Sequence, residues 1–142
     1  MMQELKSAFG KKFITISIDT ENRWIRTNWV GYLTHDNIKA GALAYMKAVR
    51  ESGFSCVLND TREVLGSWDH SLDWVVNEWA SQAAAAGIRN FALITSPESF
   101  AESTASNFHA NNKAFEVRVF ADRTSAEAWL RQHSLSKKSN QQ

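Results

Sequence analysis

The stretch FSCVLN, residues 54–59, decides how the rest of this sequence can fold. It is short and almost continuously apolar, which is the pattern of a β-strand covered on both faces. Apolar residues recur at helical spacing before it and after it, as expected of crossover helices. The sequence therefore predicts an α/β protein in which this strand is central and helices cover both faces of the sheet.

Upstream of this strand, the sequence predicts a β-hairpin and a helix. Residues 13–19 alternate apolar and polar side chains, and residues 24–31 are expected to be the antiparallel partner strand after a polar turn. The apolar spacing then becomes helical, with Thr34 as the expected cap and Gly53 as the expected end. Residues 1–12 are polar and are expected to form a flexible N-terminus.

Downstream of the central strand, two further helices and another buried strand are expected. A loop over residues 60–66 leads into a helix that ends at Gly87, and residues 91–95 form the next apolar strand. Ser96 and Pro97 are typical of the N-cap and first-turn positions, so the following helix is predicted to begin there.

The remaining elements complete a single domain over residues 13–133. Residues 116–120 predict an edge strand, and the capping box at residues 124–127 opens the last helix. Residues 134–142 have nothing to bury and are expected to be disordered. The element order ββαβαβαβα predicts a three-layer sandwich with a mixed sheet of about five strands, of which the first is antiparallel.

The composition excludes two classes of partner. The chain has 142 residues, with 16 Lys and Arg against 15 Asp and Glu, and a net charge of +1. Nucleic-acid binding requires clustered cations, whereas here they are scattered. No apolar run approaches the ~20 residues that span a bilayer, and no N-terminal stretch resembles a signal peptide. We therefore expect a cytoplasmic, bacterial protein with neither nucleic-acid binding nor membrane insertion.

The common catalytic and metal-binding motifs are missing from the sequence. Its six glycines form no phosphate-binding loop, and there is no G-x-S-x-G elbow. The four histidines and the single cysteine, Cys56, lack zinc spacing, and Cys56 is expected to be a buried thiol. We expect no cofactor, no metal and no catalytic residue.

Candidate binding residues follow the ends of the predicted strands. In open α/β sheets, ligands bind outside the carboxyl ends of the parallel strands, where helix N-termini also favour anions. The loop after residues 54–59 holds the densest set of polar groups in the chain. The residues expected to bind a ligand or a partner at this edge are Tyr32, Asp60, Arg62, Ser67, Trp68, His70 and Ser96.

Each of these residues also has a purely structural interpretation. Asp60 at a strand end commonly accepts a hydrogen bond from its own turn, and Arg62 pairs either with an anion or with Asp60. Ser67 suits a helix cap, and Trp68 either covers a pocket or closes the edge of the core. His70 follows a loop, and an exposed histidine is more often solvated than catalytic.

Trp74 stands out among the six tryptophans. At helical spacing it lies roughly 200° from Leu72, on the polar face with Asp73 and Asn77. An aromatic side chain on a polar face predicts a contact with a partner, a second subunit or a covering loop. Trp74 is therefore the expected interface residue of a homodimer.

Several short stretches resemble the SpoIIAA-like, or STAS-type, domains, which belong to a group of small STAS/SEC14-like bacterial proteins. The resemblance covers residues 13–132. The stretches that carry it are residues 29–32, 57–62, 66–68, 91–96, 120–122 and 128–130, together with Trp74 and Trp79.

The resemblance implies a non-enzymatic role. Anti-sigma-factor antagonists of this fold bind a partner kinase and are switched by phosphorylation of a serine at the start of the second helix, and other members bind small or hydrophobic ligands. By this resemblance, Ser67 or its neighbour would correspond to that serine, which makes Ser67 the candidate for phosphorylation. The antagonists read D-S-[ST]-G there, whereas this chain reads Gly66-Ser67-Trp68-Asp69, which favours a pocket lidded by an aromatic ring over a kinase switch.

The sequence thus predicts a STAS-like regulatory, signalling or small-ligand-binding module that acts through the carboxyl edge of its sheet. Its partner would be a protein or a small, hydrophobic ligand. Two alternatives remain open: a hydrolase-type enzyme that uses Asp60 or His70 at the same edge, and a homodimeric scaffold joined through Trp74.

Overall fold

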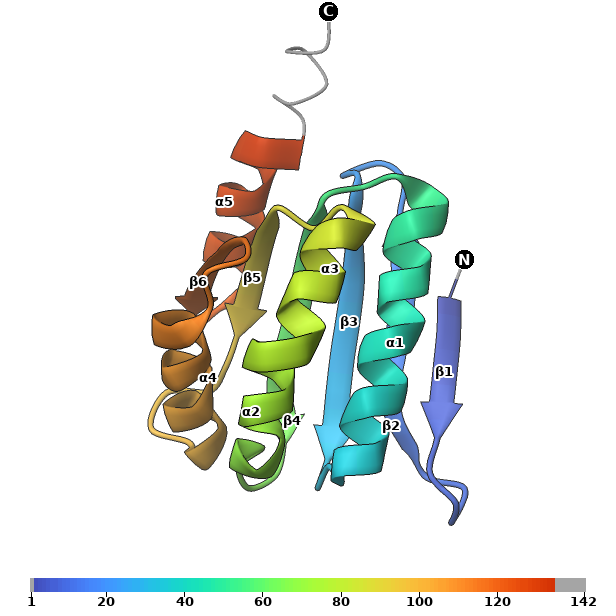
Figure 1. Ribbon diagram of the computed structural model, residues 1–142, viewed down its shortest axis with the longest axis vertical. Coiled ribbons are helices and arrows are strands. Elements are labelled where there is room, and N and C mark those ends of the chain that lie inside the picture. Colours follow the sequence, from blue (N-terminus) through green and yellow to red (C-terminus); the bar gives the residue numbers. More distant parts are fainter. Residues whose placement is uncertain (1, 135–142) are drawn as a thin grey trace, which may run out of the picture.

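The computed structural model describes residues 2–134, which form one six-stranded mixed sheet with helices on both faces (Figure 1). The strands lie side by side in the order in which they occur in the chain. They are β1 (Met2–Lys6), β2 (Lys12–Asp19), β3 (Trp24–Gly31), β4 (Cys56–Val64), β5 (Asn90–Ile94) and β6 (Glu116–Phe120). The first three strands pair antiparallel and the last four pair parallel, as the α/β prediction requires.

Helical crossovers connect the parallel strands. Helix α1 (His35–Ser52) joins β3 to β4, α4 (Phe100–Asn111) joins β5 to β6, and α5 (Arg123–Ser134) follows β6. The crossover from β4 to β5 is one continuous helical segment of changing pitch. Its pieces are the 3₁₀ turn η1 (Asp69–Ser71), α2 (Leu72–Trp74), the π-helical turn η2 (Val75–Trp79) and α3 (Ala80–Ala86).

The helices form two unequal layers. Each parallel strand is added beside its predecessor in the same direction, so right-handed crossovers carry α1, α2, α3 and α4 across the same face of the sheet. Helix α5 alone lies behind the sheet in Figure 1, against β4, β5 and β6. We call these two sides the crossover face and the α5 face.

The core on the crossover face is built around Trp79, whose side chain is 1% exposed. Its ring meets Tyr45, Phe91 and Phe115 edge-on, with ring centroids 5.6, 5.9 and 5.9 Å away. Edge-to-face pairs of this kind contribute about 0.5–1.5 kcal/mol each beyond the area they bury. The α5 face holds a smaller cluster of Trp24, Cys56, Leu58, Ala92, Ile94, Ala126, Trp129 and Leu130.

The central strand is covered on both faces, as predicted. In β4, Val57 packs in the crossover-face core, while Cys56 and Leu58 pack against α5. Each of the three is 0 or 1% exposed. Both ends of α1 are also as predicted: Thr34 Oγ1 accepts a hydrogen bond from the Asn37 amide, and Gly53 takes a left-handed conformation with φ of 75°.

The N-terminus departs from the prediction. Residues Met2–Lys6 are not flexible but form β1, which pairs antiparallel with β2 and brings the sheet to six strands rather than five. An edge strand needs only backbone hydrogen bonds on one side and a single apolar anchor, and Leu5 supplies that anchor by packing against the core. The predicted tail over residues 134–142 lies outside the described residues, except for Ser134, which ends α5.

Two predicted helix starts are displaced. Helix α4 begins at Phe100 and its N-cap is Ser99, whose side chain accepts from the Glu102 amide, so Ser96 belongs to the preceding turn. The S-x-x-E spacing at Ser99 is the stronger start signal because the cap bonds directly to the third helical residue. At α5, the Asp122 carboxylate accepts from a first-turn amide, the role predicted for Thr124.

Helix α1 crosses the sheet so closely that position 41 has no room for a side chain. A Cβ atom on Gly41 would lie 2.5 Å from the Trp29 Cη2 atom and 2.8 Å from its Cζ3 atom. Trp29 is 5% exposed and fixed in the core by an edge-on contact with Tyr45. Glycine at this position therefore sets how closely helix and sheet approach.

The Gly41→Ala variant tests this packing. We expect the free energy of unfolding to fall by about 1–3 kcal/mol, the usual cost of overpacking. Alanine is the better helix former by about 1 kcal/mol, so without the contact the sign would be reversed. Urea denaturation measures the change. In a Trp29→Phe background the smaller ring leaves space, and the cost of alanine is expected to disappear; an unchanged cost there would rule out the contact.

Candidate functional site

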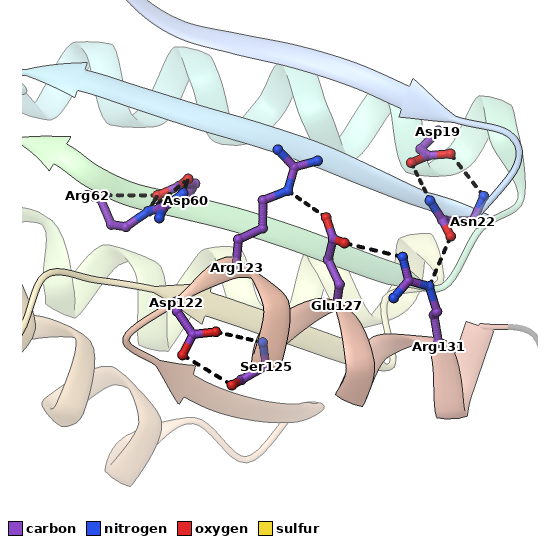
Figure 2. A network of polar contacts seen from close by, with 9 residues as sticks. All are labelled: Asp19, Asn22, Asp60, Arg62, Asp122, Arg123, Ser125, Glu127 and Arg131. Carbon is purple, nitrogen blue, oxygen red and sulfur yellow. Dashed lines mark hydrogen bonds and ion pairs between the residues drawn. The ribbon is translucent and has the colours of Figure 1, made fainter.

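The carboxyl ends of β3, β4 and β5 carry the predicted site residues, but the pleat divides them between the two faces of the sheet. Successive side chains of a strand point to opposite faces. Asn59 and Thr61 therefore face the crossover layer, whereas Asp60 and Arg62 face the side on which α5 lies (Figure 2). Asp60 and Arg62 thus do not share a site with Trp68, which belongs to the crossover-face core.

A cavity of about 50 Å³ lies under the crossover helices, at the carboxyl ends of these strands. We call it the Trp68 cavity. Aliphatic side chains from α1, η2 and β5 contribute to its walls. Its aromatic lining consists of Trp29, Tyr45, Trp68, Trp79, Phe91 and Phe108.

Two polar side chains of β4 reach this cavity, and both are tied to the sheet. Asn59 Oδ1 accepts hydrogen bonds from Thr27 Oγ1, at 2.6 Å, and from Trp29 Nε1, at 2.8 Å. Since an indole N–H can only donate, this contact fixes the orientation of the Asn59 amide and leaves its Nδ2 group as a donor. Thr61 Oγ1 donates to the Ile94 carbonyl at 2.7 Å. Asn59 therefore has a donor left, whereas Thr61 Oγ1, whose hydrogen is already used, can only accept.

Trp68 closes the cavity from the loop between β4 and η1. Its side chain is 9% exposed, and its ring meets Phe108 of α4 edge-on at 6.0 Å. Gly66 precedes it with a φ of 74°, a left-handed conformation that suits glycine. We call residues 65–71 the lid. Trp68 both lines the cavity and belongs to the crossover-face core.

The lid is fastened on both sides by side-chain hydrogen bonds. On one side, Thr104 Oγ1 of α4 donates to the Asp69 carboxylate, and Thr104 is fully buried. On the other side, His35 Nδ1 at the start of α1 lies 2.8 Å from Ser71 Oγ, and Ser71 is 1% exposed. These two bonds connect the lid to the helices that flank it.

The wall opposite the sheet contains the π-helical turn η2. A π turn spans one residue more than a turn of α-helix, and such turns are frequent at functional sites. Here it carries Val75 at its first position and Trp79 at its last, and both line the cavity. The sequence placed Trp79 on the buried stripe of a regular helix and gave no sign of the change in pitch.

On the α5 face, Arg62 and Asp60 form an ion pair and hydrogen bonds with each other. Arg62 Nη2 lies 2.7 Å from Asp60 Oδ2, Arg62 Nε donates to the same carboxylate, and the Arg62 amide donates to Asp60 Oδ1 at 3.0 Å. The hydrogen bonds that the Arg62 guanidinium donates to the Asp60 carboxylate raise the pKa of Arg62. Both structural interpretations of this pair, a turn bond and an ion pair, are therefore present, and the guanidinium charge is already neutralised.

A chain of polar contacts holds α5 to the β2–β3 turn (Figure 2). Glu127 accepts from Arg123 at 2.5 Å and from Arg131 at 3.2 Å. Arg131 Nε also donates to Asn22 Oδ1 at 3.3 Å, and the Asn22 side chain in turn donates to Asp19. The Arg131 guanidinium stands 5.5 Å from the centre of the Trp24 ring. These contacts fix the position of α5 and involve exposed groups whose individual contributions are small.

The other predicted site residues are dispersed. Tyr32 is 77% exposed, and a Cβ on Gly66 would lie 3.4 Å from its ring, so it rests beside the lid. Ser67 lies in the lid but makes no cap bond, because the helical segment starts only at Asp69 without a capping side chain. His70 is exposed on η1. Ser96 Oγ donates to the Arg62 carbonyl at 3.4 Å and links two strand ends.

Trp74, the predicted interface residue, has contacts within the chain. Its ring meets His35 edge-on at 6.1 Å, and Lys39 Nζ lies 5.8 Å from the ring centre. The side chain is half-buried and packs against the crossover-face core. The ring contacts come from α1 of the same chain, and the predicted contact with a partner, a second subunit or a covering loop stays a prediction.

Several residues of the Trp68 cavity were missed as site residues, and one signal could have found them. The period of two along β4 separates Asn59 and Thr61 from Asp60 and Arg62, and only the first pair shares a face with the apolar stripes of the crossover helices. The aromatic lining from α1 and α4 could not be assigned to a cavity from spacing, because the same spacing describes a filled core.

Within residues 2–134, no three metal-binding side chains lie together, and no helix is long and apolar enough to cross a membrane. Comparison with known proteins gives a clearer result. A model of the SpoIIAA-like family matches residues 5–131. The chain belongs to the SpoIIAA-like family. Members of this family are generally regulatory or binding modules rather than enzymes, and the match confirms the resemblance seen in the sequence.

A solved structure supports the SpoIIAA-like fold. It is a protein from Shewanella loihica PV-4, described as an uncharacterized protein from the DUF3478 family with a SpoIIAA-like fold. The two share 21% sequence identity with a TM-score of 0.59, and the match covers 83% of this chain and 94% of that chain. At this identity the likeness concerns the fold alone. A search of the curated proteins finds no match.

The fastening of the lid leads to a prediction for Thr104→Val. This change keeps the side-chain shape but removes the donor to Asp69, so we expect the lid to open more often. Loss of one hydrogen bond corresponds to roughly two- to tenfold faster hydrogen exchange of the lid amides. Hydrogen-exchange mass spectrometry of peptides over residues 65–71 measures this. The control is Ser103→Ala, an exposed neighbour on the same helix; equal exchange in both variants would mean that the bond does not restrain the lid.

The cap of α5 predicts a pH dependence. Hydrogen bonds from the Ser125 amide and hydroxyl lower the pKa of Asp122 below its ordinary value of 3.8. Because the folded-state pKa of Asp122 lies below 3.8, the ionised carboxylate contributes its full stabilisation above pH 3.8. This stabilisation is lost as the pH falls through the folded-state pKa. Asp122→Ala should therefore melt at a lower temperature than the wild type at pH 7, and the gap should narrow below pH 3.8. Asp122→Asn, which keeps an acceptor, should show a smaller gap; a gap independent of pH would contradict this role.

Proposed function

We propose that this SpoIIAA-like protein is a non-enzymatic, cytoplasmic binding module whose Trp68 cavity takes a small, mostly apolar ligand. The observation that carries the proposal is the cavity itself. It lies at the carboxyl ends of the parallel strands, the usual position of ligand sites in α/β sheets, and its walls are aromatic and aliphatic with two fixed polar groups. Ligand pockets have this composition, whereas well-packed cores leave few voids larger than a water molecule.

The size of the cavity implies that the lid moves when a ligand enters. A cavity that accommodates benzene measures about 150 Å³, roughly three times the present volume of about 50 Å³. Trp68 is the movable part of the wall, because it stands on a loop after Gly66 and not on a strand or long helix. Ligand binding would therefore shift the balance between closed and open positions of the lid.

Movement of the lid would give the protein a regulatory output. Leu65 at the start of the lid is 52% exposed, and Tyr32 beside it is 77% exposed. A protein partner that contacts these side chains would distinguish the two lid positions, as expected for a signalling module. Ser67 lies in the same segment, so a phosphate added there would act on the lid through its charge.

The hydrolase alternative has less support from the geometry. Asp60 faces the α5 side and is held by Arg62, whereas His70 is exposed on η1 over the crossover face. An acid and a base that act on one substrate have to reach the same reacting atoms. The homodimeric scaffold also has less support, since Trp74 already packs against His35 and Lys39.

Two substitutions on α1 test the proposed function. Ala42 lines the cavity, so Ala42→Leu would fill it, and Ala40→Leu adds the same atoms to an exposed position of the same helix. We expect native mass spectrometry or a thermal-shift screen of small apolar compounds to detect binding to the wild type and to Ala40→Leu, but at least tenfold weaker binding to Ala42→Leu. Binding that is unaffected in Ala42→Leu, or no binding by any compound of the screen, would overturn the proposal.

A further inference from the structure

Two buried hydrogen-bond donors of the Trp68 cavity have no acceptor in the described part of the chain. These are the indole N–H groups of Trp68 and Trp79, both inaccessible to solvent and without a partner within residues 2–134. Their side chains are 9% and 1% exposed, and both rings line the cavity. One ring stands on the lid and the other on the π turn, so two separate elements each place an indole with an unpaired N–H group in the wall of the cavity.

An unpaired buried donor is costly, and buried polar groups nearly always find a partner. Phenylalanine would avoid this cost because it has no N–H group, but its smaller ring would also fill less of the core. The neighbouring indole of Trp29 shows the usual solution, because its N–H donates to Asn59 Oδ1. The N–H groups of Trp68 and Trp79 lack such a partner among the described residues, and the rings that carry them border a cavity in which an occupant could supply the acceptor.

The cavity is also uncharged. None of its described lining side chains is a lysine, arginine, histidine, aspartate or glutamate. Tyr45 is the one lining group that could ionise, and burial raises its pKa well above the ordinary value, which keeps the phenol protonated. A charged ligand would lose its hydration here without gaining a counter-ion. The lining thus disfavours a carboxylate or an ammonium group.

We propose that the Trp68 cavity selects a small neutral molecule with a hydrogen-bond acceptor, such as a ketone, ester or ether oxygen, which accepts from the indole N–H groups of Trp68 and Trp79. This inference rests on the proposed function and adds the chemistry of recognition to it. Pure hydrocarbons would leave both donors unpaired, and ionised analogues would bring an uncompensated charge into an apolar space.

Trp24 provides an internal control. Its indole N–H also lacks a partner within the described residues, but it lies in the cluster on the α5 face and does not line the cavity. An unpaired indole therefore does not by itself mark a binding site. What distinguishes Trp68 and Trp79 is the space beside them, and only their N–H groups should respond to a ligand.

The test uses three probes that share a five-membered carbon ring: cyclopentanone, the hydrocarbon methylenecyclopentane, which matches it in size, and the slightly larger cyclopentanecarboxylate. They are titrated into the ¹⁵N-labelled protein while the indole N–H signals of the six tryptophans are followed by NMR. We expect cyclopentanone to bind about tenfold more tightly than methylenecyclopentane, the usual effect of satisfying a buried donor, and more tightly than the carboxylate. The indole signal of Trp68 or Trp79 should move downfield with cyclopentanone, while that of Trp24 stays in place.

Trp68→Phe and Trp79→Phe assign these signals and test the donors directly. Each variant keeps an aromatic ring but loses one N–H group, so the preference for the ketone over the hydrocarbon should shrink even if overall affinity changes. The preference is a ratio within one variant, so it stays informative if Trp79→Phe lowers stability, and Trp68→Phe alone suffices if Trp79→Phe does not fold.

The possible failures are distinguishable. Equal binding of ketone and hydrocarbon, with unmoved indole signals, would overturn the acceptor inference and leave the proposed function standing. Tightest binding of the carboxylate would overturn the preference for neutral ligands. If none of the three probes binds to the wild type, while the thermal-shift screen also finds no ligand, the proposed function fails together with the inference.

Discussion

The pleat of β4 constrains the side chains at its carboxyl end to alternate between the buried crossover face and the more exposed α5 face of the sheet. This constraint separates the polar groups of one short segment into two systems with different roles. Asn59 and Thr61 enter the crossover layer, where they hold the sheet together and supply the polar part of the Trp68 cavity. Asp60 and Arg62 turn to the α5 side, where they neutralise each other. A site that used both pairs would require the strand to break its pleat.

Much of the fold was predictable, because its signals are local. The apolar run of β4, the cap at Thr34 and the glycine at Gly53 all act over a few residues and all proved right. The strand that was missed, in contrast, depends on non-local partners. Strand β1 exists because β2 offers it a hydrogen-bonding edge and because Leu5 finds the core, and neither fact is visible in a polar N-terminal sequence.

The location of the candidate site could be predicted, but the set of residues that line it could not. The edge of the sheet and the lid position of Trp68 followed from general rules for α/β proteins and from the sequence around Gly66. Which residues share a cavity depended on the pleat of β4 and on the π turn at η2. A π turn changes the phase of a helix by about one residue, and a sequence that fits a regular helix gives no indication of it. The unpaired indole donors are likewise a property of three-dimensional packing.

Every strand of the sheet pairs with its immediate predecessor in the chain, so each can pair as soon as it has been synthesised. Strands that are close in the chain pair faster than strands that are far apart, because less loop-closure entropy is lost. Helix α5 is the exception, because it is made after the last strand and yet covers β4, β5 and β6. Until α5 leaves the ribosome, the apolar side chains of Leu58 and Ile94 have no cover on that face. The nascent protein is therefore most exposed to aggregation in the interval between the pairing of β6 and the docking of its last helix.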